Sequence, residues 1–169
     1  EESRTQVRMK MKEFLPIENY VPHRGAMLLI DRLVSADAEG AVAEVIVPRD
    51  GLFLQDAGMP SWVGLEYMAQ TVAAWAGWRG SQAGNSVKLG FLLGTRKFSA
   101  AVEYFAPGTP LAVHVQCELL SDNGLGMFDC KILSGEQEWA TARVSVYEPE
   151  DGLAYLRALK TTGSSPNNE

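Results

Sequence analysis

The sequence has few of the residues that build disulfide frameworks, metal centres and nucleotide sites. It contains only two cysteines and two histidines among 169 residues. Cys117 and Cys130 stand apart, with no CxxC motif and no Cys/His cluster, so we expect neither a disulfide scaffold nor a bound metal. The sequence also has no P-loop spacing and no G-x-S-x-G turn. Two isolated cysteines favour a reducing, cytoplasmic setting.

The sequence also lacks a basic excess and a long hydrophobic run. Its net charge of −6 argues against a nucleic-acid partner. The longest apolar-rich stretch, residues 62–78, is interrupted by Glu66 and Gln70 and is shorter than the roughly 20 residues of a membrane span. No apolar stretch of signal-peptide length follows the polar N-terminal segment. We therefore expect neither a nucleic-acid partner nor a membrane span.

No repeat or linker divides the chain, and its length fits a single domain. The charged segment 1–12 and the polar segment 161–169 have the composition of flexible ends. We therefore expect one folded domain over residues 13–160.

The stretch S-W-V-G-L-E-Y-M-A-Q-T-V-A-A-W-A-G-W-R predicts a helix over residues 61–79. Its apolar residues cover nearly the whole circumference, so the helix must be buried on all sides. Pro60 suits a first-turn position, and Ser61 is a candidate cap. At 1.5 Å per residue, the helix would be roughly 28 Å long.

The remaining segments read as strands separated by turns that contain glycine, proline or asparagine. The predicted strand runs are 27–37, 41–48, 88–94, 96–104, 110–122, 126–134 and 139–148. Short turns between late strands indicate an antiparallel sheet, and residues 152–160 suggest a short final helix. About six strands around one buried helix give an α+β domain with the hot-dog arrangement, in which the sheet wraps the helix.

Glu66 is the polar exception on the predicted helix. An unpaired buried carboxylate is energetically costly, and Gln70 lies four residues later on the same face, where it could hydrogen-bond to Glu66. A carboxyl in an apolar setting can hold a proton and donate it to a substrate. A satisfied structural glutamate, or one at a subunit edge, is the alternative.

The two histidines and the basic residues are further candidates for the functional site. His23 lies on a loop fixed by Pro22, just before a buried strand, and loops held by rigid elements often carry function. His114 alternates with polar residues and is interpreted as a surface residue. The basic residues suggest a rim on an acidic protein, although scattered solubilising charge explains them equally well; they are Arg24, Arg32, Arg79, Lys88, Arg96 and Lys97.

Two motifs resemble those of the 3-hydroxyacyl-acyl-carrier-protein dehydratases. Residues 22–32 read P-H-R-G-A-M-L-L-I-D-R, similar to the family's P-H-R followed by L-L-x-D-R. Residues 60–70 read P-S-W-V-G-L-E-Y-M-A-Q, similar to its P-G-V-L-x-x-E-x-M-A-Q. The P-H-R-G-A-M variant is most similar to dehydratase-like proteins of aryl-polyene biosynthesis. The chain departs at Leu52, where ordinary members have a catalytic histidine, and at Ser61, where they have glycine.

The resemblance implies a hot-dog dimer that removes water from a 3-hydroxyacyl thioester, in fatty-acid or aryl-polyene-type biosynthesis, with no metal or diffusible cofactor. The substrate would be carried on the phosphopantetheine arm of an acyl carrier protein. His23 would remove the α-proton, and Glu66, contributed by the partner subunit, would protonate the leaving hydroxyl. Backbone amides near Ser61 and Trp62 would stabilise the enolate oxygen. Arg24, Arg96 and Lys97 are the predicted contacts for the carrier protein.

Two alternatives stay open. The chain could be a catalytically silent subunit in a heterodimer with a related hot-dog dehydratase, supplying only Glu66 or carrier-protein contacts. A hot-dog thioesterase, in which a helix carboxylate works without histidine, is the less favoured alternative.

Overall fold

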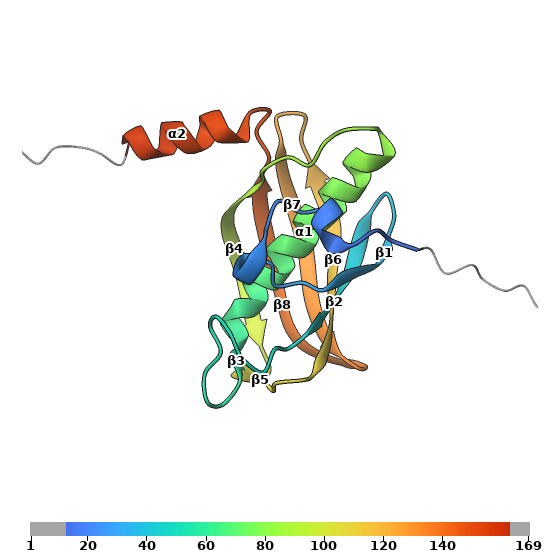
Figure 1. Cartoon of the computed structure of the whole chain (residues 1–169), viewed down its shortest axis with the longest axis vertical. Coiled ribbons are helices and arrows are strands. Elements are labelled where there is room, and N and C mark those ends of the chain that lie inside the picture. The colour runs from blue at the N-terminus through green and yellow to red at the C-terminus, as the bar shows by residue number, and fades with distance from the viewer. Residues whose placement is uncertain (1–12, 163–169) are drawn as a thin grey trace, which may run out of the picture.

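A six-stranded antiparallel sheet forms most of the computed structural model, which describes residues 13–162 (Figure 1). The strand order is β1-β2-β6-β7-β8-β4, and a separate two-stranded sheet joins β3 to β5. The strands of the large sheet are β1 (Arg32–Ala36), β2 (Gly40–Ile46), β4 (Phe91–Ala100), β6 (Pro110–Leu120), β7 (Leu125–Ser134) and β8 (Gln137–Tyr147). The short strands are β3 (Met59–Pro60) and β5 (Tyr104–Phe105). Because β1 and β4 end the order, they are the two edges of the sheet.

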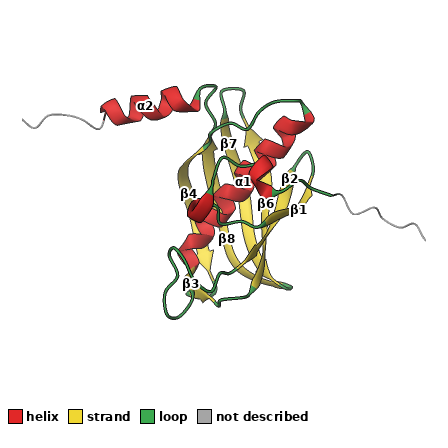
Figure 2. Ribbon diagram, in the orientation of Figure 1, coloured by secondary structure: helices red, strands yellow, loops and turns green. Residues whose placement is uncertain are grey.

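Helix α1 (Gly64–Gln82) lies across the inner face of this sheet (Figure 2). It contacts β1, β2, β6, β7 and β8, as a helix that is apolar all round requires. Trp75 on α1 is 2% exposed, and its ring meets that of Phe128 edge-on, with centroids 5.5 Å apart. Strand residues facing the helix alternate with residues facing outward, as the pleat dictates. The predicted hot-dog arrangement is therefore confirmed.

Several local predictions need correction. Residues 27–37 were expected to form one strand, but β1 covers only Arg32–Ala36, and Gly25–Met27 forms the 3-10 helix η2. The two runs at 88–94 and 96–104 give a single long strand, β4, which is interrupted by two register shifts against β8. A short 3-10 helix, η3 (Ser61–Val63), precedes α1, and the Ser61 side chain makes no capping hydrogen bond. The helix therefore starts three residues later than expected.

The structure describes the predicted final helix but only a small part of the two segments that were predicted to be flexible. The predicted final helix is present as α2 (Gly152–Thr162), so the first two residues of the segment expected to be flexible are helical. Residues 1–12 and 163–169 lie outside the described residues. Figure 1 shows α2 extending away from the body of the domain, past the β4 edge. Among the helices of the described residues, none is long and apolar enough to cross a membrane.

Candidate active site

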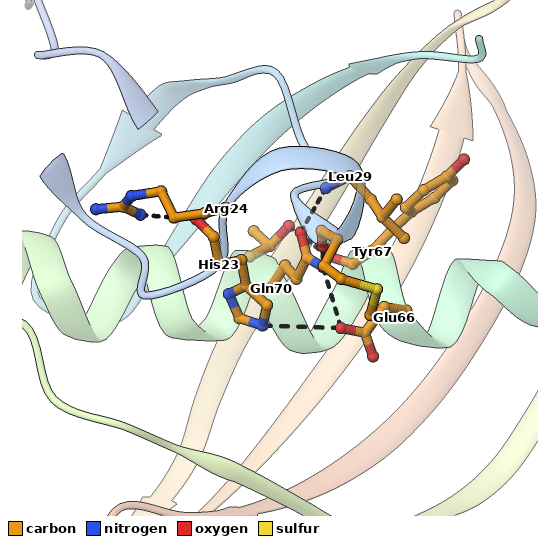
Figure 3. A network of polar contacts seen from close by, with 8 residues as sticks. His23, Arg24, Leu29, Glu66, Tyr67 and Gln70 are labelled. Carbon is orange, nitrogen blue, oxygen red and sulfur yellow. Dashed lines mark hydrogen bonds and ion pairs between the residues drawn. The ribbon is translucent and has the colours of Figure 1, made fainter. Parts of the chain in front are cut away.

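His23 and Glu66 form the centre of the candidate site (Figure 3). Glu66 lies in the first turn of α1, and His23 lies in the loop between η1 (Ile17–Asn19) and η2. The Nε2 atom of His23 is 3.8 Å from Oε1 of Glu66, although the two residues are 43 positions apart in the chain. The family resemblance predicts that Glu66 of a partner subunit faces His23, whereas the structure brings the two residues together within one chain.

Gln70 fixes the geometry of this pair. Its side chain is fully buried, and its Nε2 donates hydrogen bonds to Oε1 of Glu66 (3.0 Å) and to the carbonyl of Met27 (2.7 Å). Its Oε1 accepts a hydrogen bond from the backbone amide of Leu29 (2.8 Å). The predicted contact with Glu66 is therefore present, and the same amide also ties the segment that follows His23 to α1.

Arg24 holds the other side of the His23 loop. Its guanidinium donates hydrogen bonds to three backbone carbonyls, those of Val21 (2.6 Å), His23 (2.7 Å) and Glu18 (2.8 Å). Figure 3 shows the Arg24 side chain pointing away from Glu66. These three hydrogen bonds hold the loop, so the role of Arg24 in this structure is to shape the backbone around His23.

The surroundings of His23 favour the neutral form of its imidazole. Burial lowers its pKa, the Glu66 carboxylate partly offsets this effect, and Arg24 adds to the lowering. The Nδ1 atom is buried with no hydrogen-bond partner among the described residues, so Nε2 is the nitrogen that a substrate can reach. A neutral imidazole with an accessible Nε2 beside a carboxyl group is suited to general acid–base catalysis.

A cavity of about 390 Å³ begins at His23 and Glu66 and follows α1 towards its C-terminal end. Its floor is a stripe of small residues spaced by three or four positions: Ala69, Ala73, Ala76 and Gly80. Apolar and aromatic side chains form much of the wall, including Val72, Trp75, Phe91, Leu92, Phe128 and Tyr147. These wall residues were not predicted from the sequence, although the spacing of the small residues indicates a groove along the helix. A cavity with this lining can hold an apolar group beside the His23–Glu66 pair.

Comparisons with known proteins agree with this geometry. The sequence model of the ApeP dehydratase family matches residues 15–157. The chain belongs to the ApeP dehydratase family. The solved structure of the dehydratase heterocomplex ApeI:P from Xenorhabdus doucetiae has 28% sequence identity and a TM-score of 0.80, covering 87% of this chain and 99% of that chain.

More distant structures share only the fold with this ApeP-family chain. The PaaI protein from the phenylacetic acid degradation operon of E. coli has a TM-score of 0.53 and 16% identity, covering 68% of this chain and 80% of its own. An uncharacterised protein from Pyrococcus horikoshii has a TM-score of 0.59 and 10% identity, covering 83% of this chain and 99% of its own. No curated protein sequence was similar enough to count as a match.

Other predicted site residues of the ApeP-family chain lie elsewhere. The Ser61 amide donates to the carbonyl of Glu103 (2.8 Å), so it is not free to bind a substrate oxygen in this structure. Trp62 is 55% exposed beside Phe53, with ring centroids 5.9 Å apart. Leu52 is exposed on the same loop. His114 lies on the outer face of the sheet, on β6.

The basic residues do not form one rim. Arg32 pairs with Glu44 on the outer face, and Arg79 lies over the Trp75 ring, 4.7 Å from its centroid. Lys88 lines the Glu66 cavity, whereas Lys97 lines a separate hollow on the outer face of the sheet. Of the three residues predicted to contact a carrier protein, only Arg24 lies beside the His23–Glu66 pair.

Replacing Gln70 with leucine is expected to lower the free energy of unfolding by about 1–3 kcal/mol, because the Leu29 amide and the Met27 carbonyl lose their partner. The segment after His23 would also be released from α1. Chemical denaturation measures the loss of stability. The matched control is Gln116→Leu on the exposed face of β6, which should change stability by less than about 0.5 kcal/mol. Equal effects of the two substitutions would contradict the bridging role of Gln70.

Replacing Glu66 with glutamine should lower the pKa of His23 further, because it removes the only group found to raise it. NMR titration can measure the pKa of His23 in this variant. His114 is the only other histidine of the chain and provides an internal reference. A lowered pKa in the folded state means that the unfolded chain binds the proton more readily. The stability that neutral His23 contributes is therefore lost as the pH falls below 6.5, which is the ordinary pKa of a histidine side chain. A rise in the His23 pKa in this variant would rule out the assigned electrostatics.

Proposed function

We propose that this chain dehydrates a 3-hydroxyacyl thioester carried on the phosphopantetheine arm of an acyl carrier protein. The observation that carries the proposal is the His23–Glu66 pair, whose nearest atoms are 3.8 Å apart at one end of an apolar cavity. Dehydration needs one group that accepts the α-proton and one that protonates the departing hydroxyl. The pair supplies both groups. The chain's membership of the ApeP dehydratase family agrees with this chemistry.

The reaction balances within the pair. Nε2 of His23 removes the proton from the α-carbon, the carbon–oxygen bond at the β-carbon breaks, and the protonated Glu66 carboxyl gives its proton to the leaving hydroxyl, which departs as water. This leaves an imidazolium beside a carboxylate. Because the two groups are neighbours, the proton returns from His23 to Glu66 directly or through one water molecule. The pair therefore holds one proton before and after each turnover, and no cofactor is consumed.

Both side chains of the pair are partly exposed. The Glu66 side chain is 38% exposed, and that of His23 is 26% exposed, so Glu66 is less buried than its sequence pattern predicts. A substrate in the cavity would therefore reach both groups. Of the two amides proposed to stabilise the enolate oxygen, Trp62 is retained as the candidate, because the Ser61 amide is already bonded.

We also propose a second hot-dog subunit as the partner. Of the structures described above, the most similar is the dehydratase heterocomplex ApeI:P from Xenorhabdus doucetiae. The aromatic residues Trp75, Phe91, Phe128 and Tyr147 that line the cavity support an aryl-polyene-type acyl chain as the substrate. The silent-subunit alternative remains the second candidate because of that heterocomplex. In that case, this chain would contribute only Glu66 or carrier-protein contacts, and the other catalytic groups would come from its partner.

Turnover separates these candidates. The full chain is incubated with a 3-hydroxyacyl carrier protein, alone and with a related hot-dog dehydratase, and mass spectrometry follows the loss of one water from the acyl group. Water loss by the chain alone supports the proposal. Release of free thiol without water loss would instead identify a thioesterase. If turnover occurs only in the mixture and does not depend on His23, the silent-subunit candidate replaces the proposal.

A further inference from the structure

The cavity that contains Glu66 has a second end, far from the reacting pair. The α1 residues that line it run from Glu66 to Gly80, a rise of roughly 21 Å along the helix axis. The residues that line the far end come from the loop after α1, the start of β4 and the end of β8: Lys88, Gly90, Phe91, Tyr147 and Glu148. The chemistry proposed above concerns only the first end, so this distal end acts on the far part of a bound molecule.

Two aromatic side chains, Phe91 and Tyr147, form the distal wall of the cavity. Phe91 is the first residue of β4 and Tyr147 is the last residue of β8, and the two lie opposite each other in the strand pair. Both line the cavity, and both are only partly buried. Because each residue ends its strand, the strands alone do not support the outer side of these rings.

Tyr155 of α2 supplies this support. Its ring centroid is 4.9 Å from that of Phe91, and 5.1 Å from that of Tyr147, whose ring it meets edge-on. Tilted and edge-on pairs at such distances are favourable arrangements of aromatic rings. Within the part of the chain that the structure describes, the lining of the cavity includes Phe91 and Tyr147 but not Tyr155. Tyr155 therefore stands behind the distal wall and holds both of its rings.

The first turn of α2 fixes the position of Tyr155. The Oδ1 atom of Asp151 accepts a hydrogen bond from the Ala154 amide (2.9 Å), and the Asp151 carbonyl accepts one from the Tyr155 amide (3.1 Å). Gly152 and Tyr155 are three positions apart, so they share one face of the helix. They are also the only two residues of α2 that are not exposed. The helix is therefore seated on the domain through its first turn.

Gly152 brings the same turn against the loop that follows α1. A Cβ atom at position 152 would lie 2.6 Å from the Cβ atom of Leu89, so only glycine allows this close approach. Leu89 is the one residue between positions 81 and 90 that is not exposed, and its neighbours Lys88 and Gly90 line the cavity. One turn of α2 therefore holds all three segments that enclose the distal end.

We propose that Tyr155 is a positioning residue that makes the cavity selective for long acyl chains. By holding the rings of Phe91 and Tyr147, it fixes the distal wall, and a chain long enough to reach that wall gains apolar contact there. Without Tyr155, water would reach the outer side of both rings, and the wall would lose its fixed shape. A short chain ends before the distal wall, so it gains nothing from α2.

A binding experiment tests this inference, which rests on the proposed function only in taking an acyl thioester as the occupant. The full-length chain binds cis-parinaric acid, a conjugated fatty acid whose fluorescence rises out of water, and hexanoyl- or dodecanoyl-pantetheine displaces it. Tyr155→Ala should weaken the binding of the dodecanoyl compound by about three- to tenfold, the usual worth of aromatic contacts. Binding of the hexanoyl compound should stay within about twofold of the wild type. Tyr155→Phe keeps the ring and should restore wild-type binding of both compounds.

Two further variants test whether Tyr155 acts through the distal wall. Phe91→Ala removes one ring of the wall, so adding Tyr155→Ala to it should cost less than the sum of the two single losses, as for residues in contact. Gly152→Ala displaces the start of α2 from Leu89 and leaves every aromatic ring in place. It should weaken dodecanoyl binding in the same direction as Tyr155→Ala, because α2 can no longer seat Tyr155 against the wall.

The control is Leu153→Ala, on the same helix at a side chain that is 58% exposed. It should leave the binding of both compounds unchanged, and circular dichroism checks that each variant is folded. Equal losses for the short and the long compound in Tyr155→Ala would overturn the proposal. Unchanged dodecanoyl binding in that variant, or a wild type that does not bind the probe, would overturn it too. The readout is binding, so length selection without water loss would count against the proposed function alone.

Discussion

Replacement of His23 with alanine is expected to lower kcat for dehydration of a 3-hydroxyacyl carrier protein by about 10²–10⁴-fold, the usual contribution of a positioned general base. The loss should appear mainly in kcat, because the apolar cavity that holds the acyl chain is unchanged. Steady-state kinetics with mass-spectrometric detection of the unsaturated product measures it. Glu66→Gln should give a loss of similar size, since glutamine has no acidic proton to donate to the leaving hydroxyl.

His114→Ala is the matched control for this experiment. His114 is the other histidine of the chain and lies on the outer face of the sheet, away from the Glu66 cavity. Its removal should leave kcat within a factor of about two, as for surface changes that touch no reacting group. If the His23 variant retains wild-type turnover while remaining folded, His23 is not the base, and catalysis would have to be assigned to a partner subunit.

Gly77→Ala is expected to lower the free energy of unfolding by at least about 1–3 kcal/mol, the usual cost of overpacking a core. A Cβ atom at position 77 would overlap the carbonyl oxygen of Tyr20 and lie 2.9 Å from its Cα atom. These are backbone atoms, so no side-chain rotation relieves the overlap. Tyr20 precedes His23 by three residues, and displacement of its backbone should also move His23 away from Glu66. The substitution should therefore lower both the temperature of thermal denaturation and kcat.

Gly80→Ala provides the control on the same helix. The nearest atom to a Cβ at position 80 is 3.7 Å away, an ordinary van der Waals distance. Because glycine within a helix costs roughly 0.5–1 kcal/mol relative to alanine, this change should leave stability unchanged or raise it. If Gly77→Ala is as well tolerated as Gly80→Ala, then α1 and the Tyr20 backbone are not packed as closely as described.

The fold could be predicted well from the sequence because its main signals are local. Nearly continuous apolar character over residues 61–79 predicts a helix buried on all sides. Alternation along residues such as Val113, His114 and Val115 predicts a strand with one buried face. Where a long-range hydrogen bond overrides the local pattern, prediction failed: residues 27–31 look like a strand, but Gln70 on α1 binds the Met27 and Leu29 backbone instead.

By itself, the sequence determined the wrapped-helix architecture, the choice of Glu66 and Gln70 as neighbouring polar residues on α1, and His23 as the remaining histidine on a fixed loop. The first two conclusions follow from periodicity and from the cost of burying a carboxylate. The choice of His23 follows from its loop position and from the resemblance of the P-H-R motif to that of the dehydratases. Only the tertiary structure decided that His23 and Glu66 of one chain meet and that the Ser61 amide is occupied. Those facts depend on distances between segments far apart in the chain, which are set by strand pairing and helix packing and not by local pattern.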